Sequence, residues 1–577
     1  MLRISTVVVL TLLLASLAFG AQHLARESQA SLLAFHSPYL AWLPPLPPAE
    51  PPRLPLTGQV VLLMADGMTD EVSWRMPALQ YLRSRGASAG LALAAPTLTP
   101  ASWATTLTGA VPEIHGTVAG GPVTADHLLR GLKGSALTTA AYAGGAWRDL
   151  FGPWLNQFVE FPADVPPADS LALRPLSGLL SSRPALLVIQ TDYLERVGAR
   201  YGTAGPEYRE AAAQLDVLLT RVVSGLNLDQ STVVVTAGYG LTPRGRHGGM
   251  ERPVARVPLV MAGRGVQHGV FGDIPQVNLA PTLAVLLGVR PPAQAAGRPA
   301  ADLLRVDRNN PGLARAREVE AASYRHDLQV LWLQPGAAPP ATSGGTLSGT
   351  SEADLKTLES AARSARQARL REERLARLPW GGGAIAAALL LLVLLAWRRG
   401  LFTLALGPGV YFVAYYALFW GPWSFGPFFP GHALSFSWSA VNPLAALPAF
   451  WRQRAAEALL AAALAALVTG LALRFPASRR RGRPSGSGRA RGSAVRPVAP
   501  VVAGFHLALT ICLVLALQVA YAWVMDGPPY GLFLPDPGRF AKLQLDLLQL
   551  EVVGYSALGL GLLTRLAGPQ GRAWPPR

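Results

Sequence analysis

Residues 232–249 read TVVVTAGYGLTPRGRHGG, a short apolar run that leads into a glycine-rich loop. The three valines at 233–235 predict a buried β-strand, and the glycines at 238 and 240 end it. Open α/β sheets place their binding and catalytic groups in loops at the carboxyl ends of such strands. The stretch therefore predicts an α/β sheet with a functional edge, at which this loop contributes the imidazole of His247.

Strand-like and helix-like segments alternate over residues 56–305. Helical stretches lie between the strands, and one of them, Glu207–Val223, places Ala211, Leu215 and Leu218 on one face. Strands that alternate with helices predict a mainly parallel sheet with helices on both faces. The expected strands are Val60–Met64, Ala136–Tyr142, Leu186–Gln190, Thr232–Thr236 and Val257–Met261.

The whole chain is more apolar than an ordinary soluble protein. Of its 577 residues 50% are hydrophobic, and its mean hydropathy is +0.28. These values predict an exported soluble domain, residues 56–305, joined to an α-helical membrane domain, residues 381–577. The only cysteine, Cys512, lies in an apolar run, which excludes an intramolecular disulfide. About five spans are expected in the membrane domain, at 384–397, 401–420, 455–473, 500–525 and 547–566.

The formal charge of +17 reflects unevenly distributed arginines. Eight of them crowd the acid-free segment 474–500 between two apolar runs. If the runs alternate across a membrane, Arg398, Arg399 and the basic C-terminal tail fall on the same side as this segment. The positive-inside rule then predicts that 474–500 is cytoplasmic and 56–380 extracytoplasmic. A membrane topology signal explains the charge better than nucleic-acid binding does, and no nucleic-acid partner is expected.

Arg452 and Arg454 are the exception to this distribution, because they fall on the opposite side.

Two flanking segments complete the predicted organisation. Residues 1–21 are a signal peptide or an uncleaved N-terminal membrane anchor, with a small-x-small motif before Ala21, and 22–55 form a proline-rich spacer. Residues 306–380 are a linker followed by a charged stalk helix. Ser351 and Asp354 cap the start of this helix, and Pro379 is expected to end it.

Four motifs in the α/β segment carry polar residues at strand ends or in turns. Asp66 follows the strand in VVLLMADGMTDE, and Asp192 follows the strand in LLVIQTDYLERVGARYG. Thr99 lies in a proline-bracketed turn of PTLTPASWATTLTGAVPEIHGT, and the last motif is VNLAPTLAVLLGVRPPAQAAGRP. Singly each is a weak signal, because a strand-end aspartate is usually a helix cap or a turn residue.

In this order the motifs resemble the alkaline phosphatase superfamily, in particular its type I phosphodiesterase/nucleotide pyrophosphatase branch. The resemblance covers residues 56–305. It implies two divalent metal ions, usually zinc, at the carboxyl edge of a parallel sheet, where they activate a threonine or serine nucleophile. By the same resemblance Thr99 matches the nucleophile, and Ser102 takes the place of an asparagine that contacts the phosphoryl oxygens. Asp66, Asp192 and His247 match metal ligands.

Several ligand positions of that family are missing here. Arg196 stands where a histidine is expected, and Gly238 and Tyr239 stand in place of an Asp-His pair. The resemblance then leaves at most two ligands to each metal: Asp192 with His247, and Asp66 with Thr99. Catalytic zinc generally needs three protein ligands. Glu195 is the one additional carboxylate expected near the site.

Two functions stay open at this point. The lost ligands favour a pseudoenzyme, an exported binding or scaffolding domain with low or no activity that holds one weakly bound metal or none. The retained Asp66, Thr99, Asp192 and His247 favour an active phosphodiesterase, phosphatase or phosphotransferase with an altered metal site. Its substrate would be a phosphate ester or a lipid-linked molecule of the cell envelope, an expectation that rests on analogy with membrane phosphoethanolamine transferases.

Two further expectations concern the site. Asp66, Thr99, Asp192 and His247 are expected to share one pocket at the carboxyl edge of the sheet. Replacing Gly238 with aspartate and Tyr239 with histidine is expected to restore metal occupancy, provided that the backbone matches that of the family.

Overall fold

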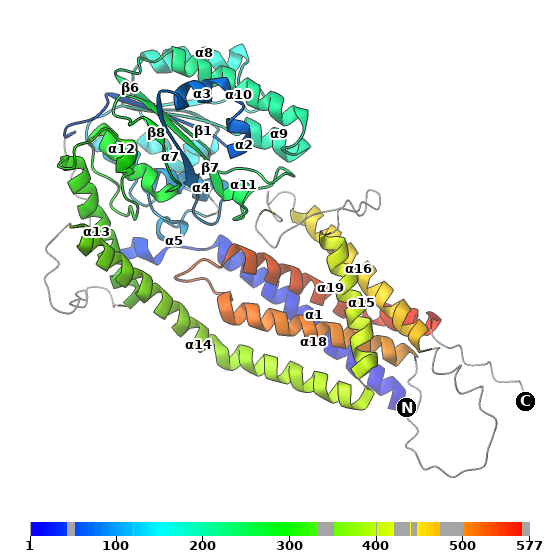
Figure 1. Ribbon diagram of the computed structural model, residues 1–577. Coiled ribbons are helices and arrows are strands. Elements are labelled where there is room, and N and C mark those ends of the chain that lie inside the picture. The colour runs from blue at the N-terminus through cyan, green and yellow to red at the C-terminus, as the bar shows by residue number, and fades with distance from the viewer. Residues whose placement is uncertain are drawn as a thin grey trace, which may run out of the picture.

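The computed structural model combines an α/β domain with a bundle of long helices (Figure 1). Three of the sequence predictions concern residues outside the described part of the chain: most of the arginine-rich segment 474–500, most of the proline-rich run, and the basic C-terminal tail. The residues described are 2–42, 52–118, 120–332, 351–399, 401–420, 439, 447–473 and 500–567.

One mixed sheet of nine strands forms the α/β domain. Its order is β4-β3-β5-β1-β6-β7-β2-β8, with β9 paired to β2. All pairings are parallel except those of β7 with β6 and with β2. The strands are β1 (Gln59–Ala65), β2 (Gly86–Ala92), β3 (Thr139–Ala143), β4 (Gln157–Glu160), β5 (Leu186–Thr191), β6 (Ser231–Thr236), β7 (Arg256–Gly263), β8 (Gly269–Val270) and β9 (Ile274–Pro275).

Helices cover both faces of this sheet, as the alternating pattern predicted (Figure 1). The predicted α/β fold class is thereby confirmed. The helices of the domain are α2 (Asp70–Ser73), α3 (Pro77–Arg83), α4 (Thr99–Thr108), α5 (Pro112–His115), α6 (Leu128–Gly134), α7 (Ala146–Phe151), α8 (Ser170–Ser181), α9 (Tyr193–Tyr201), α10 (Pro206–Ser224), α11 (Arg252–Ala255) and α12 (Leu279–Leu287). Short 3-10 helices are η1 (Pro38–Trp42), η2 (Gly152–Trp154), η3 (Gln276–Asn278) and η4 (Ala301–Leu303).

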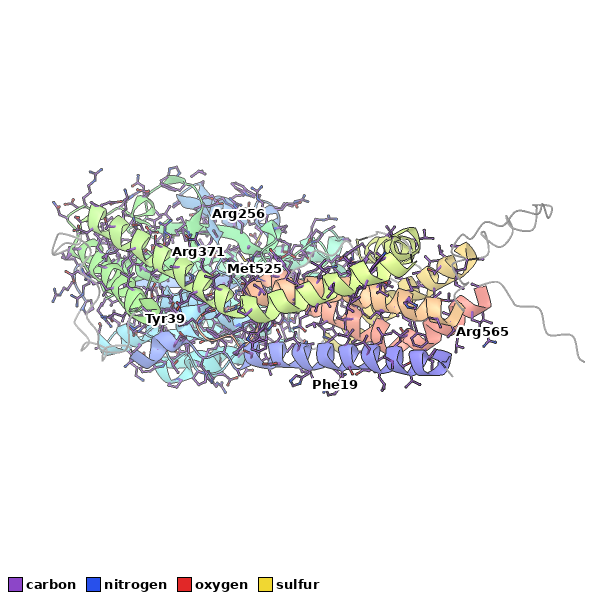
Figure 2. All side chains as sticks on the ribbon, turned by 90° about the horizontal axis from the view of Figure 1, so that it is seen from below. Phe19, Tyr39, Arg256, Arg371, Met525 and Arg565 are labelled. Atoms are coloured by element: carbon purple, nitrogen blue, oxygen red, sulfur yellow. The ribbon has the colours of Figure 1, made fainter. Side chains whose placement is uncertain are left out.

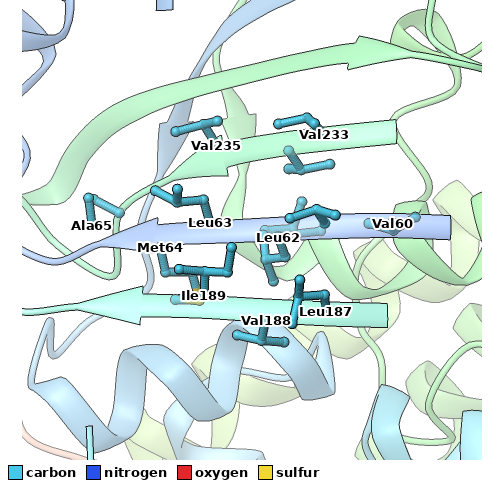
Figure 3. Packing of buried hydrophobic residues seen from close by; sticks show 14 of the residues in the cluster. Val60, Leu62, Leu63, Met64, Ala65, Leu187, Val188, Ile189, Val233 and Val235 are labelled. Carbon is cyan, nitrogen blue, oxygen red and sulfur yellow. The ribbon is translucent and has the colours of Figure 1, made fainter. Parts of the chain in front are cut away.

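The centre of the core is β1, which lies between β5 and β6 (Figure 3). Every residue of β1 is buried, because helices pack on both faces of a central parallel strand. Burying one large aliphatic side chain of this kind contributes about 1.5–3 kcal/mol. The continuous apolar run thus fixes β1 in the middle of the sheet and sets the polar residues that follow it at the sheet edge.

β2 is the main strand that the sequence pattern did not predict. Its sequence, GASAGLA, lacks the β-branched residues that signal a strand. It pairs with β7 along its whole length, and a Cβ at Gly86 would collide with the backbone of Met261 on β7. Small residues are therefore needed for this close approach, although they give no periodic signal.

Five helices of the described residues are long and apolar enough to cross a membrane: α1, α14, α16, α18 and α19. The five apolar runs predicted after the α/β domain all fall in helices. Four of these helices are among the five long ones, and the other, α15, has a shorter apolar stretch. The helices outside the α/β domain are α1 (Leu2–Leu33), α13 (Pro311–Trp332), α14 (Glu352–Arg399), α15 (Leu401–Trp420), α16 (Leu447–Ala472), α18 (Pro500–Asp526) and α19 (Pro537–Ala567).

Two helices differ from the sequence expectations. Pro379 does not end the stalk, because α14 runs through it and joins the stalk and the first predicted span into one helix. α1 packs along the bundle and continues past the predicted cleavage motif (Figure 2). Within that motif Ala18 is buried against the bundle, whereas Phe19 is 66% exposed.

The functional edge of the sheet faces the helical bundle. Leu98, directly before α4, packs in a cluster with Phe450 and Trp451 of α16 and with residues of α1 and α19. The backbone N–H of Leu534 donates to Glu113 of α5 at 3.1 Å. The loop edge of the α/β domain therefore lies against the end of the bundle.

Candidate functional site

Three strand ends meet at this edge of the sheet. Asp66 follows β1 and Asp192 follows β5, and the backbone N–H of Asp66 donates to the carbonyl of Thr191 at 2.9 Å. The loop that contains Gly238, Tyr239 and His247 follows β6, the other neighbour of β1. Because parallel strands end at the same edge, the sheet topology alone brings these segments together.

The carboxylate of Asp66 is buried and fully engaged by protein donors. Its Oδ2 accepts from the Trp103 indole at 2.9 Å and from the Gln190 amide at 2.8 Å. Its Oδ1 accepts from the backbone N–H of Gly238 at 3.0 Å. Burial and the nearby charge of Glu195 raise the pKa of Asp66 well above its ordinary value, and the three hydrogen bonds oppose this shift.

Thr99 is the first residue of α4, and its hydroxyl belongs to a chain of hydrogen bonds. The Thr99 hydroxyl donates to the Tyr239 hydroxyl at 2.9 Å, and Tyr239 donates to Glu195 Oε2 at 2.6 Å. Burial and the charge of Glu195 raise the pKa of Tyr239 well above its ordinary value. Tyr239 is therefore a neutral phenol at physiological pH, and it is not a base for Thr99.

His247 closes the same network from the other side. Its Nε2 lies 3.0 Å from Glu195 Oε1, and its Nδ1 lies 3.2 Å from the carbonyl oxygen of Thr97. The Tyr239 ring stacks on the imidazole with centroids 3.8 Å apart and an interplanar angle of 9°. Glu195 thus binds both the phenol and the imidazole, one with each carboxylate oxygen.

The hydrogen bonds from His247 and Tyr239 lower the pKa of Glu195. Burial raises it, but the hydrogen bond and charge of His247, together with the hydrogen bond from Tyr239, hold the pKa of Glu195 below its ordinary value. Glu195 is therefore a carboxylate at neutral pH, and a weak base.

Ser102 is buried and engaged as well. Its hydroxyl donates to the carbonyl oxygen of Gly238 and accepts from the Gln276 amide at 2.9 Å. Gln276 also donates to the hydroxyl of Thr106 at 3.0 Å. Ser102 therefore ties α4 to the loop after β6 and to η3.

Asp192 lies at the same sheet edge but outside this network. Its carboxylate is about half-exposed and lies 3.4 Å from the guanidinium of Arg196, which also pairs with Asp164 at 3.3 Å. Burial raises the pKa of Asp192, and the charge of Arg196 opposes the shift. Asp192 forms an ion pair with Arg196, whereas His247 pairs with Glu195, so Asp192 and His247 do not contact each other through these ion pairs as the side chains stand.

A two-metal centre does not fit the side chains as they stand. Both oxygens of Asp66 accept hydrogen bonds from protein groups, and Nε2 of His247 faces Glu195. Over the described residues, no group of three or more His, Cys, Asp or Glu side chains is arranged to hold a metal ion. The side chains of Asp66, Tyr239, Glu195 and His247 are each engaged by other protein groups.

Two contributors were missed at the sequence level, Trp103 and Gln190. Trp103 lies one helical turn after Thr99, a spacing that places both on one face of a helix. Gln190 is a buried polar residue in the apolar strand β5, and such a residue needs a hydrogen-bond partner. The helical spacing of Trp103 and the polar residue in an apolar strand were both visible in the sequence, but neither feature predicts that Asp66 is the hydrogen-bond partner.

Comparison with known proteins supports the resemblance inferred from the motifs. The sequence profile of the type I phosphodiesterase/nucleotide pyrophosphatase family matches residues 60–122, which contain Asp66, Thr99 and Ser102. The human catalytic subunit of GPI ethanolamine phosphate transferase 3 is 28% identical over 189 residues, which are 31% of this chain and 17% of that protein. The mouse protein of the same name is 28% identical over 191 residues, with the same coverage. The matched region thus spans less than a fifth of these relatives.

Solved structures with a similar domain are more distant in sequence. Murine ectonucleotide pyrophosphatase/phosphodiesterase 5 is 11% identical with a TM-score of 0.35, over 40% of this chain and 96% of that one. The alkaline phosphatase PafA is 10% identical with a TM-score of 0.37, over 44% of this chain and 100% of that one.

Proposed function

We propose that the α/β domain is an extracytoplasmic binding or scaffolding domain on a membrane anchor, with low or no phosphodiesterase activity. The observation that carries this proposal is that protein groups already engage the polar side chains of the site: Trp103 donates to Asp66, and Glu195 pairs with both Tyr239 and His247. Hydrolysis at Thr99 needs a nearby base or cation, because a threonine hydroxyl is scarcely ionised at neutral pH. The Thr99 hydroxyl instead donates a hydrogen bond to a neutral phenol, that of Tyr239.

An active phosphotransferase is the second candidate. The half-buried Thr99 at the start of α4, with its hydroxyl held by Tyr239, favours it. The two curated relatives are named ethanolamine phosphate transferases, which suggests a phosphate ester or a lipid-linked molecule of the envelope as substrate. Such an activity would require Tyr239 or Glu195 to turn away so that a divalent ion, zinc by analogy, could enter.

Metal content and turnover of the full-length protein in detergent distinguish the two candidates. We expect at most one weakly bound ion per chain, and equal rates for the unmodified chain and Thr99→Ala on aryl phosphate monoesters and diesters with zinc added. Thr99→Ala is a suitable comparison because it removes the hydroxyl under test, together with one methyl group. Two tightly bound metals, together with turnover that Thr99→Ala abolishes, would overturn the proposal and establish the enzyme.

A further inference from the structure

Arg454 is an exception to the arginine distribution of this chain, and it is fully buried. It lies about two turns inside α16, counted from the helix end nearest the α/β domain. α16 is one of the helices long and apolar enough to cross a membrane. Ionisable side chains in such helices are costly and usually serve a function. The question is which group Arg454 serves.

The protein itself does not satisfy this guanidinium. One of its nitrogens lies 2.7 Å from Oε1 of Glu457. Nevertheless, within the described part of the chain none of its three nitrogens makes a hydrogen bond of acceptable geometry, and Oε2 of Glu457 makes none either. The rings of Phe419 and Phe450 lie with their centroids 5.4 Å from its central carbon. A guanidinium offers five N–H donors in a fixed fork, and among the described residues Glu457 is the one carboxylate that pairs with this fork.

Two further groups act near the Arg454 guanidinium: the hydroxyl of Tyr415, which is a hydrogen-bond donor, and the positive charge of Arg244. Tyr415 of α15 is buried without a hydrogen bond to its hydroxyl, and it interacts electrostatically with both Arg454 and Glu457. The charge of Arg244, in the loop between Tyr239 and His247, also acts on Arg454. The carboxylate of Glu457 is therefore paired with one guanidinium, that of Arg454, which also experiences the charge of Arg244.

A purely structural ion pair explains this arrangement poorly. A buried ion pair offsets its desolvation cost only when the remaining hydrogen-bonding groups are satisfied. Here both partners keep unsatisfied atoms, so the carboxylate of Glu457 is an incomplete acceptor for the fork of Arg454. An anion with more oxygen atoms would offer acceptors to the N–H donors that Glu457 leaves without a hydrogen bond.

The position of Arg454 relates it to the loop edge of the α/β domain. Phe450 lies beside Arg454 and belongs to the same cluster as Leu98, the residue before Thr99. A depth of about two turns from the end of α16 corresponds to about 10 Å. With this end of α16 at the membrane surface, Arg454 would lie near the level at which lipid headgroups meet the hydrocarbon core.

We propose that Arg454 and Tyr415 form a binding site for the phosphate group of a membrane lipid, with the phosphate oxygens taking the place of the Glu457 carboxylate. The arginine fork matches two phosphate oxygens, and the phenol donates to a third. This site lies outside the Thr99 network and goes beyond the proposed function, since it requires no turnover at Thr99.

Binding to the full-length protein in detergent tests the site. The probes are a short-chain phosphatidic acid, a diacylglycerol with the same chains, and inorganic phosphate. We expect the phosphatidic acid to bind, the diacylglycerol not to bind, and inorganic phosphate to bind at least about tenfold more weakly, because it lacks acyl chains to bury. Equal affinities for inorganic phosphate and the lipid would support the phosphate site and assign it to free phosphate. Binding of the diacylglycerol as tight as that of the phosphatidic acid would overturn the proposal.

Variants separate this site from a structural ion pair. We expect Arg454→Gln to weaken binding of the phosphatidic acid by at least about tenfold, since it removes a charge-assisted contact. Tyr415→Phe should weaken it several-fold, and Glu457→Gln should tighten it because the competing carboxylate is gone. Arg452→Gln is the matched control, since it removes an exposed arginine of the same helix and should change nothing.

Unchanged affinity in a folded Arg454→Gln protein would overturn the proposal. If that variant does not fold, unchanged affinity in both Tyr415→Phe and Glu457→Gln would do so. Thr99→Ala should bind the lipid like the unmodified chain, so failure of this site is distinguishable from failure of the proposed function.

Discussion

A Cβ at Gly238 would collide with Oδ1 of Asp66 and would lie 3.2 Å from both Cδ1 and Nε1 of Trp103. A carboxylate at this position would also meet the buried charge of Asp66. This collision argues against the expectation that Gly238→Asp, with Tyr239→His, restores metal occupancy, which stays a prediction under its condition that the backbone matches that of the family. Trp103 fills the space that the added side chain needs.

The tightness of this contact gives the first prediction at the residue scale. Gly238→Ala should lower the free energy of unfolding by about 1–3 kcal/mol, the usual cost of overpacking a buried site. Gly178→Ala in α8 is the control, since a Cβ there meets nothing within 4 Å. It should leave stability unchanged or raise it by up to about 1 kcal/mol. Thermal unfolding followed by tryptophan fluorescence measures both, and equal melting temperatures would contradict the packing described.

Buried histidines predict an acid-labile fold. His115 accepts from the backbone N–H of Thr117 at 3.1 Å, and its other nitrogen lies 3.0 Å from the Thr105 hydroxyl. Burial lowers the pKa of His115 from 6.5 to about 3. Between these values the unfolded chain binds a proton that the folded chain does not bind. Stability should therefore be unaffected by this group above pH 6.5 and should fall as the pH drops from about 6.5 to about 3.

His115→Gln should make this decline shallower, whatever the stability of the variant at pH 7, because the prediction concerns the pH dependence alone. Melting temperature as a function of pH is the measurement. His268→Gln, at an exposed position, is the control and should keep the slope of the unmodified chain. Parallel curves for His115→Gln and the unmodified chain would show that His115 does not titrate as described.

The sequence allowed part of the site to be predicted. Strand ends located Asp66, Asp192 and the loop of His247 at one sheet edge, because the topology of a parallel sheet follows from the order of its segments. The stacking of Tyr239 on His247 and its shared partner Glu195 could not be predicted. These contacts join three separate elements, and they depend on rotamers and on the space between the elements.

At the scale of elements, α14 shows tertiary packing overriding a local signal. A proline inside a helix costs about 3 kcal/mol, yet α14 continues through Pro379. Just beyond it, α14 approaches α18 so closely that a Cβ at Gly381 would collide with Val524. On the other side of the proline, Arg374 donates to the backbone carbonyl of Met525 at 3.2 Å. Contacts on both sides of the proline hold the two halves in one helix.

The packing of α1 on α19 gives a prediction at this scale. A Cβ at Gly554 would lie 2.8 Å from the Cβ of Ala18 and 2.8 Å from the carbonyl oxygen of Leu14. Gly554→Leu should therefore displace α1 and lower the melting temperature of the protein in detergent. Gly559→Leu, on the same helix but with nothing within 4 Å of its Cβ, is the matched control. Equal melting temperatures for the two variants would argue against docking of α1 at this position.

At the scale of the whole molecule, the α/β domain and the two described ends of the chain lie at opposite ends of the bundle (Figure 1). α1 begins, and α19 ends, at the end of the bundle away from the domain. This arrangement suits an even number of crossings between the two ends. Counting α15 with the five longer helices gives six. The arginine distribution is an argument independent of this helix count, because it predicts the membrane side of segments that lie outside the described residues.

Topology is accordingly the prediction for the whole molecule. Reporters fused after residue 330, in α13, and after residue 487, in the arginine-rich segment, should report opposite sides of the membrane. The second should be cytoplasmic, because the positive-inside rule places the arginine-rich segment there. The first should be extracytoplasmic, because three crossings, α14, α15 and α16, separate the two positions. Replacing the arginines at 479–481 by glutamine weakens the positive charge without altering any described helix, and it should increase the fraction of inverted chains. Both reporters on the same side would require α15 to turn back within the membrane, since removing one crossing makes the count between the two positions even.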